Sequence, residues 1–208
     1  MTTYFAPRAR LADGWHHHVT LEVSDAGFIT RVTPDSTPGA AIPLAGAVIP
    51  AMSNLHSHAF QRAMAGLAEV AGDPQDSFWT WRDLMYRMVA RLTPQQVGDI
   101  ATWLYIELLK GGYSQVAEFH YLHHDPQGQP YPDDAMLQQV MLAAERTGIG
   151  QTLLPVLYSY SSFGAQPASA GQRRFIQQTG AYLQQLQRVA AVCADKPLLN
   201  YGVCFHSL

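Results

Sequence analysis

From residue 44 onward, short apolar runs alternate with segments whose apolar residues recur at helical spacing. This alternation is the feature that most constrains the fold, because it is typical of parallel β/α units. The runs that predict strands are 44–52, 115–119, 151–157 and 198–205. Four such units are half of an eightfold β/α barrel, which needs about 250 residues. We therefore expect an α/β fold that contains the first half of a (β/α)8 barrel.

The helices expected between these strands have recognisable start and stop signals. Thr93-Pro94, followed by Gln96, predicts a helix start with a capping box, and Gly111-Gly112 predicts its end. A second helix is expected from Asp133 or Asp134 to Arg146. A third is expected within 171–194, where apolar residues again follow helical spacing.

The first 44 residues have a different pattern. Residues 19–23 and 28–32 alternate apolar and polar side chains around a turn at 24–27, which predicts a β-hairpin. A stretch rich in Pro, Gly, Ser and Thr at 33–43 predicts a boundary. We therefore expect a partial N-terminal β domain at 1–44 and the half-barrel at 45–208.

Composition excludes several classes of function. Charged residues make up 14% of the 208 residues and the formal net charge is −3, so neither nucleic acid nor an anionic membrane is an expected partner. No apolar stretch approaches the length of a membrane span, and the N-terminus lacks the apolar core of a signal peptide. The two cysteines predict no disulfide framework. These features predict a cytoplasmic protein.

The first apolar run of the half-barrel, 44–52, is followed by Ser53-Asn54-Leu55 and then by His56-Ser57-His58. Side chains at i and i+2 of a strand leave on the same face, so the two imidazoles are expected to converge. Nitrogen ligands suit zinc, and barrel active sites lie at the carboxyl ends of the strands. The spacing therefore predicts part of a metal site, although a chance pair of histidines remains the alternative.

Other polar residues near the expected strand ends are weaker candidates. Arg82 lies in an aromatic-rich connection, where it either stacks on tryptophan, pairs with Asp83 or binds a substrate carboxylate. Glu118 and Asp125 are candidate acids or bases without a local feature that assigns them a role. Four further histidines follow expected strands and are either solvated, structural or catalytic: His120, His123, His124 and His206.

The segment from Leu55 to Arg62, LHSHAFQR, resembles the metal motif of the amidohydrolase superfamily in the form found in formimidoylglutamate deiminases. Three further segments resemble the same family: FWTWRDLMYR at 78–87, VAEFHYLHHD at 116–125 and GVCFHSL at 202–208. The resemblance extends over nearly the whole chain and covers the front half of such an enzyme. It implies a truncated amidohydrolase-type (β/α)8 barrel of about four β/α units, preceded by part of a small β-sandwich domain.

The resemblance implies specific roles. His56 and His58 would ligate one zinc ion, while Gln61, Arg82, Tyr121 and His206 would surround the substrate. The substrate would be a small dicarboxylate, N-formimino-L-glutamate, hydrolysed to N-formyl-L-glutamate and ammonia during histidine degradation. The resemblance also implies a homodimer for the full-length enzyme.

The same resemblance places the remaining metal ligands and the acid/base residues beyond Leu208. We therefore expect the 208-residue chain to be inactive alone and to hold zinc substoichiometrically, unless His120, His123 or His206 supplies another ligand. Two alternatives remain at this point. One is another metal-dependent amidohydrolase, such as a guanine- or cytosine-type deaminase, and the other is a non-catalytic, self-associating half-barrel.

Overall fold

A computed structural model describes residues 1–68 and 77–206 of the chain. Two compact units are present, Met1–Ala51 and Met52–Leu208. Within the described residues, no helix combines the length and apolar character needed to cross a lipid bilayer.

The first unit is one mainly antiparallel β-sheet with the strand order β3-β2-β1-β4. Its strands are β1 (Thr2–Leu11), β2 (Gly14–Val23), β3 (Ile29–Thr33), β4 (Ile42–Pro43) and β5 (Ala47–Val48). β2 and β3 form the predicted hairpin, while the two short strands β4 and β5 both pair in parallel with β1. A small core of Ala6, Ala9, Val19 and Leu21 lies under this sheet.

The boundary between the units lies later in the chain than the predicted one at 44/45. The apolar run 44–52 is not one barrel strand, because its middle, Ala47–Val48, pairs with β1 of the first unit. The first strand of the second unit is instead β6 (Met52–Ser57), so His56 lies inside a strand and not after it. An apolar run alone does not show which sheet a strand joins, and here two sheets share the run.

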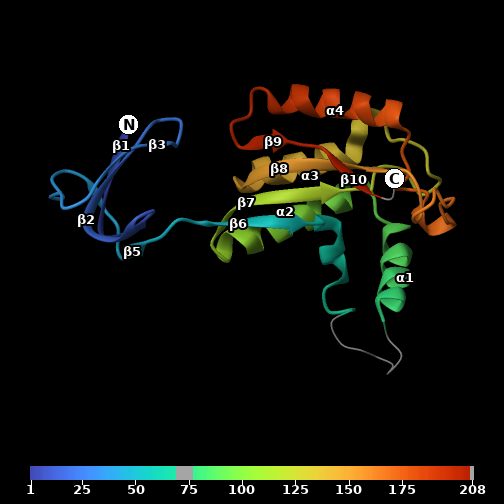
Figure 1. Ribbon diagram of the computed structural model, residues 1–208, viewed down its shortest axis with the longest axis horizontal. Coiled ribbons are helices and arrows are strands. Elements are labelled where there is room, and N and C mark those ends of the chain that lie inside the picture. The colour runs from blue at the N-terminus through green and yellow to red at the C-terminus, as the bar shows by residue number, and fades with distance from the viewer. Residues whose placement is uncertain (69–76, 207–208) are drawn as a thin grey trace. The chain divides into compact units, whose positions relative to one another are not determined.

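The second unit contains a parallel sheet with the order β10-β8-β7-β6, and β9 also pairs with β8 (Figure 1). The remaining strands are β7 (Tyr113–His120), β8 (Gly150–Tyr158), β9 (Leu199–Tyr201) and β10 (Cys204–His206). The single strand predicted at 198–205 is therefore two short strands. The expected α/β class, with a parallel half-barrel sheet, is confirmed.

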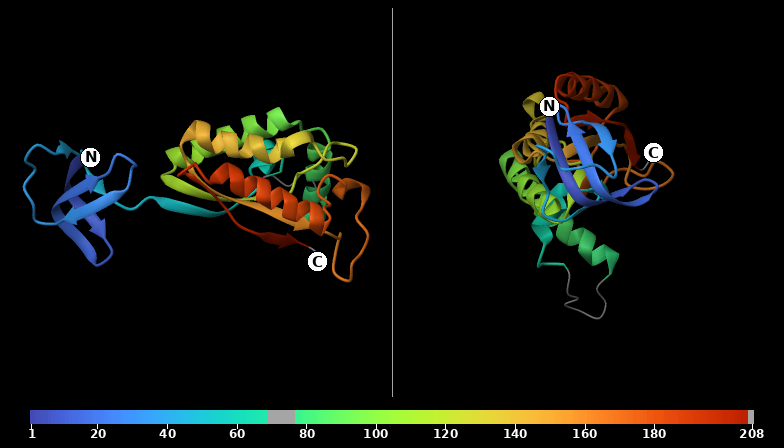
Figure 2. Two further views of the ribbon diagram at one scale, coloured as in Figure 1. Left: turned by 90° about the horizontal axis from the view of Figure 1, so that it is seen from above. Right: turned by 90° about the vertical axis from the view of Figure 1, so that its left-hand side faces the viewer.

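Helices connect successive strands (Figures 1 and 2). They are α1 (Phe78–Val89), α2 (Pro94–Lys110), α3 (Ala135–Thr147) and α4 (Thr179–Cys193), with short 3-10 segments η1 (Ala59–Met64), η2 (Pro132–Asp134) and η3 (Ala170–Gln172). α2, α3 and α4 pack against strands of the sheet, whereas α1 contacts η1 and η3. Along β7, Val116, Glu118 and His120 are buried under the helices, whereas Ala117 and Phe119 face the opposite side. This alternation decides which β7 side chains can reach the site.

Local capping explains why some helices match their predicted bounds. The Thr93 hydroxyl accepts a hydrogen bond from the Gln96 backbone N–H, and the Gln96 side chain accepts one from the Thr93 N–H, so α2 begins with a complete capping box. α3 ends at Gly148, whose positive φ of 76° suits glycine. Asp134 occupies the N-cap position of α3, but its carboxylate binds Arg188 and Gln185 and caps nothing.

Two helices differ from the prediction. The aromatic-rich segment expected to be a connection forms α1, which starts at a capping box of Ser77 and Thr80. Conversely, the helix expected within 171–194 begins only at Thr179. The segment before it includes Phe175, which packs against Tyr121 and Tyr158. The residues around Phe175 therefore pack in the site and are not part of α4.

Candidate active site

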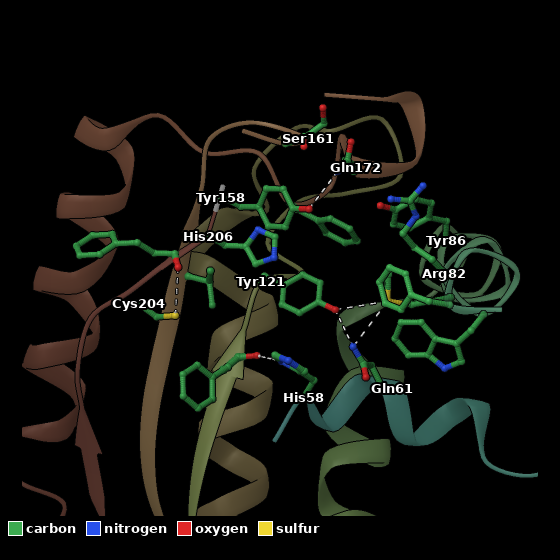
Figure 3. Close-up of a pocket in the computed structure, with 18 of the residues that line it drawn as sticks. His58, Gln61, Arg82, Tyr86, Tyr121, Tyr158, Ser161, Gln172, Cys204 and His206 are labelled. Carbon is green, nitrogen blue, oxygen red and sulfur yellow. Dashed lines mark hydrogen bonds between the residues drawn. The ribbon is translucent and has the colours of Figure 1, made fainter. Parts of the chain in front are cut away.

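A cavity of about 660 Å³ opens at the carboxyl ends of β6, β7, β8 and β10 (Figure 3). The carboxyl ends of barrel strands are where barrel enzymes place their active sites. The six residues predicted from the sequence all line this cavity: His56, His58, Gln61, Arg82, Tyr121 and His206. Residues up to 150 positions apart in the sequence are thus brought together by the parallel sheet and α1.

His56 and His58 leave the same face of the chain at the end of β6, as their spacing predicts. Their Nε2 atoms lie 3.1 Å apart. Two nitrogens bound to one tetrahedral zinc at about 2.0–2.1 Å would lie roughly 3.3 Å apart. The pair is therefore spaced as two ligands of one metal ion would be.

The ring of His58 is held in a tautomer whose Nε2 has a lone pair, which accepts a hydrogen bond from His56 Nε2 and is the atom that would bind a metal. Its Nδ1–H donates to the Phe119 carbonyl, at 2.7 Å, so Nε2 carries the lone pair (Figure 3). Burial lowers the pKa of His58, and the nearby His56 and His206 lower it further. The neutral imidazole is thereby favoured. The His56 ring stacks on Phe119, with 4.5 Å between centroids and 27° between planes.

No group of three or more His, Cys, Asp or Glu side chains suited to a metal occurs in residues 1–68 and 77–206. His120 and His123 are not available as a third ligand, because both are buried and their Nε2 atoms bond to the carbonyls of Leu122 and Val156. His120 faces the helices, on the side of β7 opposite Phe119. The described part of the chain therefore supplies two ligands, which fits the donor chemistry of an incomplete zinc site.

Gln61 and Tyr121 form a hydrogen-bonded pair next to the two histidines (Figure 3). The Gln61 amide donates to the Tyr121 hydroxyl at 2.7 Å, and that hydroxyl donates to the Met85 sulfur at 3.4 Å. Burial raises the pKa of Tyr121, so the phenol stays protonated near neutral pH. The pair presents polar groups beside an otherwise aromatic wall.

Arg82 stacks on aromatic rings of its own helix. Its guanidinium carbon lies 4.4 Å from the Trp79 ring centroid and 5.6 Å from that of Tyr86. The Nε atom is buried without a hydrogen-bond partner. No carboxylate among the described residues lies within ion-pair distance of Arg82, and Asp83 does not pair with it. The Arg82 guanidinium thus places a positive charge in the cavity, and its Nε–H has no hydrogen-bond partner.

His206 stacks on Tyr158, with 4.2 Å between ring centroids and 16° between planes (Figure 3). The Tyr158 hydroxyl in turn accepts a hydrogen bond from Gln172 at 3.1 Å. Sequence reasoning did not select Tyr158, Gln172 or Phe175 as site residues. For Tyr158 a signal existed, since it is the first residue after the strand predicted at 151–157.

Two of the weaker candidates have structural roles. Asp125 accepts hydrogen bonds from the backbone N–H groups of Gln127 and Gln129, and so closes a turn. Glu118 is fully buried on the helix-covered side of β7. Neither side chain lines the cavity.

Comparison with known proteins identifies the chain's relatives. Over its entire length it is 58% identical to formimidoylglutamate deiminase of Pseudomonas aeruginosa strain PAO1 and covers 46% of that protein. The chain is thus similar to a formimidoylglutamate deiminase over part of that protein's length, which fits the N-terminal part of an amidohydrolase. The chain spans about half the length of this curated relative. No family model matches the sequence.

Several solved structures share the fold. An amidohydrolase from Brucella melitensis aligns with a TM-score of 0.91 at 37% identity, over 98% of this chain and 45% of that one. A guanine deaminase from C. acetobutylicum with bound guanine has a TM-score of 0.64 at 17% identity, over 99% and 46% of the two chains. A zinc complex of atrazine chlorohydrolase from Arthrobacter aurescens TC1 has a TM-score of 0.69 at 14% identity, over 100% and 47%. The latter two likenesses concern the fold alone.

Proposed function

We propose that this chain supplies two metal ligands and a substrate-binding wall to a zinc-dependent formimidoylglutamate deiminase. The observation that carries the proposal is the convergence of the His56 and His58 Nε2 atoms, 3.1 Å apart, in the cavity that also holds Arg82. The identity of 58% to a curated formimidoylglutamate deiminase supports the choice of reaction.

The proposed reaction hydrolyses N-formimino-L-glutamate. Water adds to the formimino carbon, the bond from that carbon to the terminal nitrogen breaks, and N-formyl-L-glutamate and ammonia leave. A zinc ion, when bound, supplies an activated water for this attack. His56 and His58 would hold the ion through Nε2, and the zinc complex of a structural neighbour supports a metal of this kind.

Arg82 is the residue of the cavity best suited to a substrate carboxylate. Its guanidinium is always charged, is fixed in orientation by stacking on Trp79, and has an unpartnered Nε. The Gln61–Tyr121 pair and His206 provide further polar groups around the same cavity. A small anionic substrate would therefore bind with one carboxylate toward α1 and its formimino group toward the histidines.

The wider setting is also a proposal. We place the enzyme in the cytoplasm, in histidine degradation, as a homodimer in its full-length form, with no nucleic acid or membrane partner. The net charge of −3 gives no electrostatic reason to expect nucleic acid or an anionic membrane as a partner. The resemblance assigns the remaining ligands and the acid/base groups to later barrel strands, so residues 1–208 alone are expected to be inactive.

The proposal is tested by joining residues 1–208 to the C-terminal remainder of the Pseudomonas relative and measuring ammonia release from N-formimino-L-glutamate with zinc. The joined protein should release ammonia, and residues 1–208 alone should not. In the joined protein, Arg82→Met should raise KM by about tenfold to a hundredfold, because a charge-assisted contact is lost. Arg87→Met, an exposed arginine on the same helix, is the control.

Two results would contradict the proposal. A folded, zinc-loaded joined protein that releases no ammonia would exclude the reaction. An Arg82→Met variant with unchanged KM for the dicarboxylate would exclude the acidic substrate and favour a different amidohydrolase activity.

A further inference from the structure

Glu118 is a fully buried carboxylate directly behind the histidine pair, and no step proposed above uses it. It lies on β7 opposite Ser57, its parallel register partner on β6. One oxygen, Oε1, accepts a hydrogen bond from the Ala59 backbone N–H at 2.7 Å. The Ser57 side chain also hydrogen-bonds to the carboxylate. Glu118 therefore contacts the residue before His58 and the residue after it.

These contacts lie where the regular backbone hydrogen bonding of β6 and η1 is interrupted. The ladder between β6 and β7 is irregular between Asn54 and Ser57, just where the histidine pair begins. The short helix η1 starts after His58, and no side chain of its N-cap residue caps it. The Ala59 N–H is thus an orphan helix donor, and the Glu118 carboxylate satisfies it from the neighbouring strand.

The next residue of β7 holds the histidine rings from the other side. Consecutive strand residues point to opposite faces, so Phe119 faces the cavity while Glu118 faces the helices. The Phe119 carbonyl accepts the hydrogen bond from His58 Nδ1, and the Phe119 ring stacks on His56. Glu118 fixes the backbone and Phe119 fixes the rings.

The carboxylate is itself anchored by α2 and, through a further residue, by α3. The Tyr105 hydroxyl of α2 donates to Glu118 Oε2 at 3.2 Å. The Gln151 amide donates to that same hydroxyl at 2.9 Å and to the Val140 carbonyl of α3 at 3.3 Å. Tyr105 and Gln151 are both buried, so the network has little freedom to rearrange.

We propose that Glu118 is a positioning residue that fixes the backbone on both sides of His58, so that the His56 and His58 nitrogens converge before any metal binds. Its carboxylate is suited to this role, because it accepts hydrogen bonds through both oxygens and presents no donor against the Ala59 N–H. The inference rests on the proposed metal site, but its first test needs no metal.

The first test measures the tautomer of His58 in metal-free protein, by long-range nitrogen–proton NMR of the imidazole above neutral pH. Wild-type His58 should be the Nδ1–H tautomer. Glu118→Ala should shift His58 to a mixture, because the backbone on both sides loses its anchor. Glu118→Gln should keep the Nδ1–H form, since an amide oxygen still accepts from Ala59.

The second test measures zinc affinity by titration of the same variants. Glu118→Ala should weaken zinc binding by about tenfold or more, the size expected for a second-shell contact. Glu118→Gln should weaken it less. Tyr105→Phe is the matched control, because it removes a buried hydrogen bond to the same carboxylate while leaving the contacts to Ser57 and Ala59. It should lower stability without changing the His58 tautomer.

The outcomes separate this inference from the proposed function. A wild-type protein with ordered His58 but no zinc binding would count against the metal site and leave the positioning role standing. An unchanged tautomer in Glu118→Ala would overturn the positioning role, and so would a Tyr105→Phe variant that disturbs His58 as much as Glu118→Ala does. If Glu118→Ala does not fold, Glu118→Met, which fills a similar space without an acceptor, takes its place: a mixed His58 tautomer supports the inference and a pure Nδ1–H form overturns it.

Discussion

Individual side chains in this protein have their chemistry set by which face of a strand they occupy. Phe119 and Tyr121 face the cavity, whereas Glu118 and His120 are buried under the helices. A histidine on the buried side has no access to the cavity, and burial makes its charged form unfavourable. His120 therefore differs from His58 in role, although both lie at the carboxyl ends of adjacent strands.

The buried histidines predict an acid-sensitive fold. Burial lowers the pKa of His120 to about 4 and that of His123 to about 3. Unfolded histidine titrates near pH 6.5, so below that pH the unfolded state binds protons that the folded state does not. The free energy of unfolding should be fully present above pH 6.5 and should fall as the pH drops toward 4. Between about pH 7 and pH 5 the loss should be on the order of 2 kcal/mol for each histidine.

Urea unfolding at several pH values checks this expectation. His123→Gln, which cannot gain a charge, should have a flatter pH dependence than the wild type. Glu118 acts in the opposite direction, since burial raises its pKa, and it reduces the total slope. A wild-type stability that stays constant from neutral pH down to about pH 5 would show that these histidines are not buried in their neutral form.

At the scale of elements, Arg174 connects the end of α1 to two loops. Its buried guanidinium donates to the carbonyls of Val89, Leu92 and His124. Val89 is the last residue of α1, whose cavity-facing side carries Arg82. The buried arginine thus takes up carbonyl groups at the end of this helix and fixes it against the loops that follow β7 and β8.

Arg174→Met should lower the free energy of unfolding by about 3 kcal/mol, because several buried carbonyls lose charged donors. Arg174→Lys should recover part of this loss. The neighbouring Arg173 is exposed and also donates to backbone carbonyls, so Arg173→Met is a matched control, expected to cost less than about 1 kcal/mol. Urea denaturation of the three variants measures the difference, and equal losses at both positions would refute the assigned role.

The bounds of an element could be predicted from the sequence where neighbouring residues set them. They could not be predicted where contacts with distant parts of the chain set them. The start of α2 matches its prediction, because Thr93 and Gln96 cap one another within a single turn. The apolar run 44–52 carries no signal for its pairing with β1, so β6 begins later than expected. Likewise, the site residues predicted from motif resemblance line one cavity, whereas the role of Glu118 depends on the β6–β7 register, which the sequence does not state.

At the scale of the whole chain, the parallel sheet of the second unit ends at β6 on one side and β10 on the other, within the described residues. Several apolar side chains on and near these strands are exposed, among them Leu55 at 77% and Phe205 at 56%. Unpaired strand edges with exposed apolar side chains favour association with another chain. The expected resemblance to the front half of a formimidoylglutamate deiminase is confirmed.

Residues 1–208 produced alone should therefore self-associate. Size-exclusion chromatography with light scattering should give a mass of at least twice 22.9 kDa. Leu55→Lys, at the β6 edge, should shift the population toward monomer, because a lysine opposes edge pairing. Leu183→Lys on α4, also exposed, is the control and should leave the mass unchanged. A compact wild-type monomer at micromolar concentration would contradict the prediction.

The contacts from β7 to the histidine pair also set an order of events during folding. β6 and β7 are joined through α1 and α2, so they meet only after a long crossover has closed, which is a slow step for parallel strands. A nascent chain that has emerged only as far as α2 carries both imidazoles but lacks the Phe119 carbonyl that orients one of them. If the proposed metal site is correct, capture of a cation would consequently be a late event in the biosynthesis of this protein.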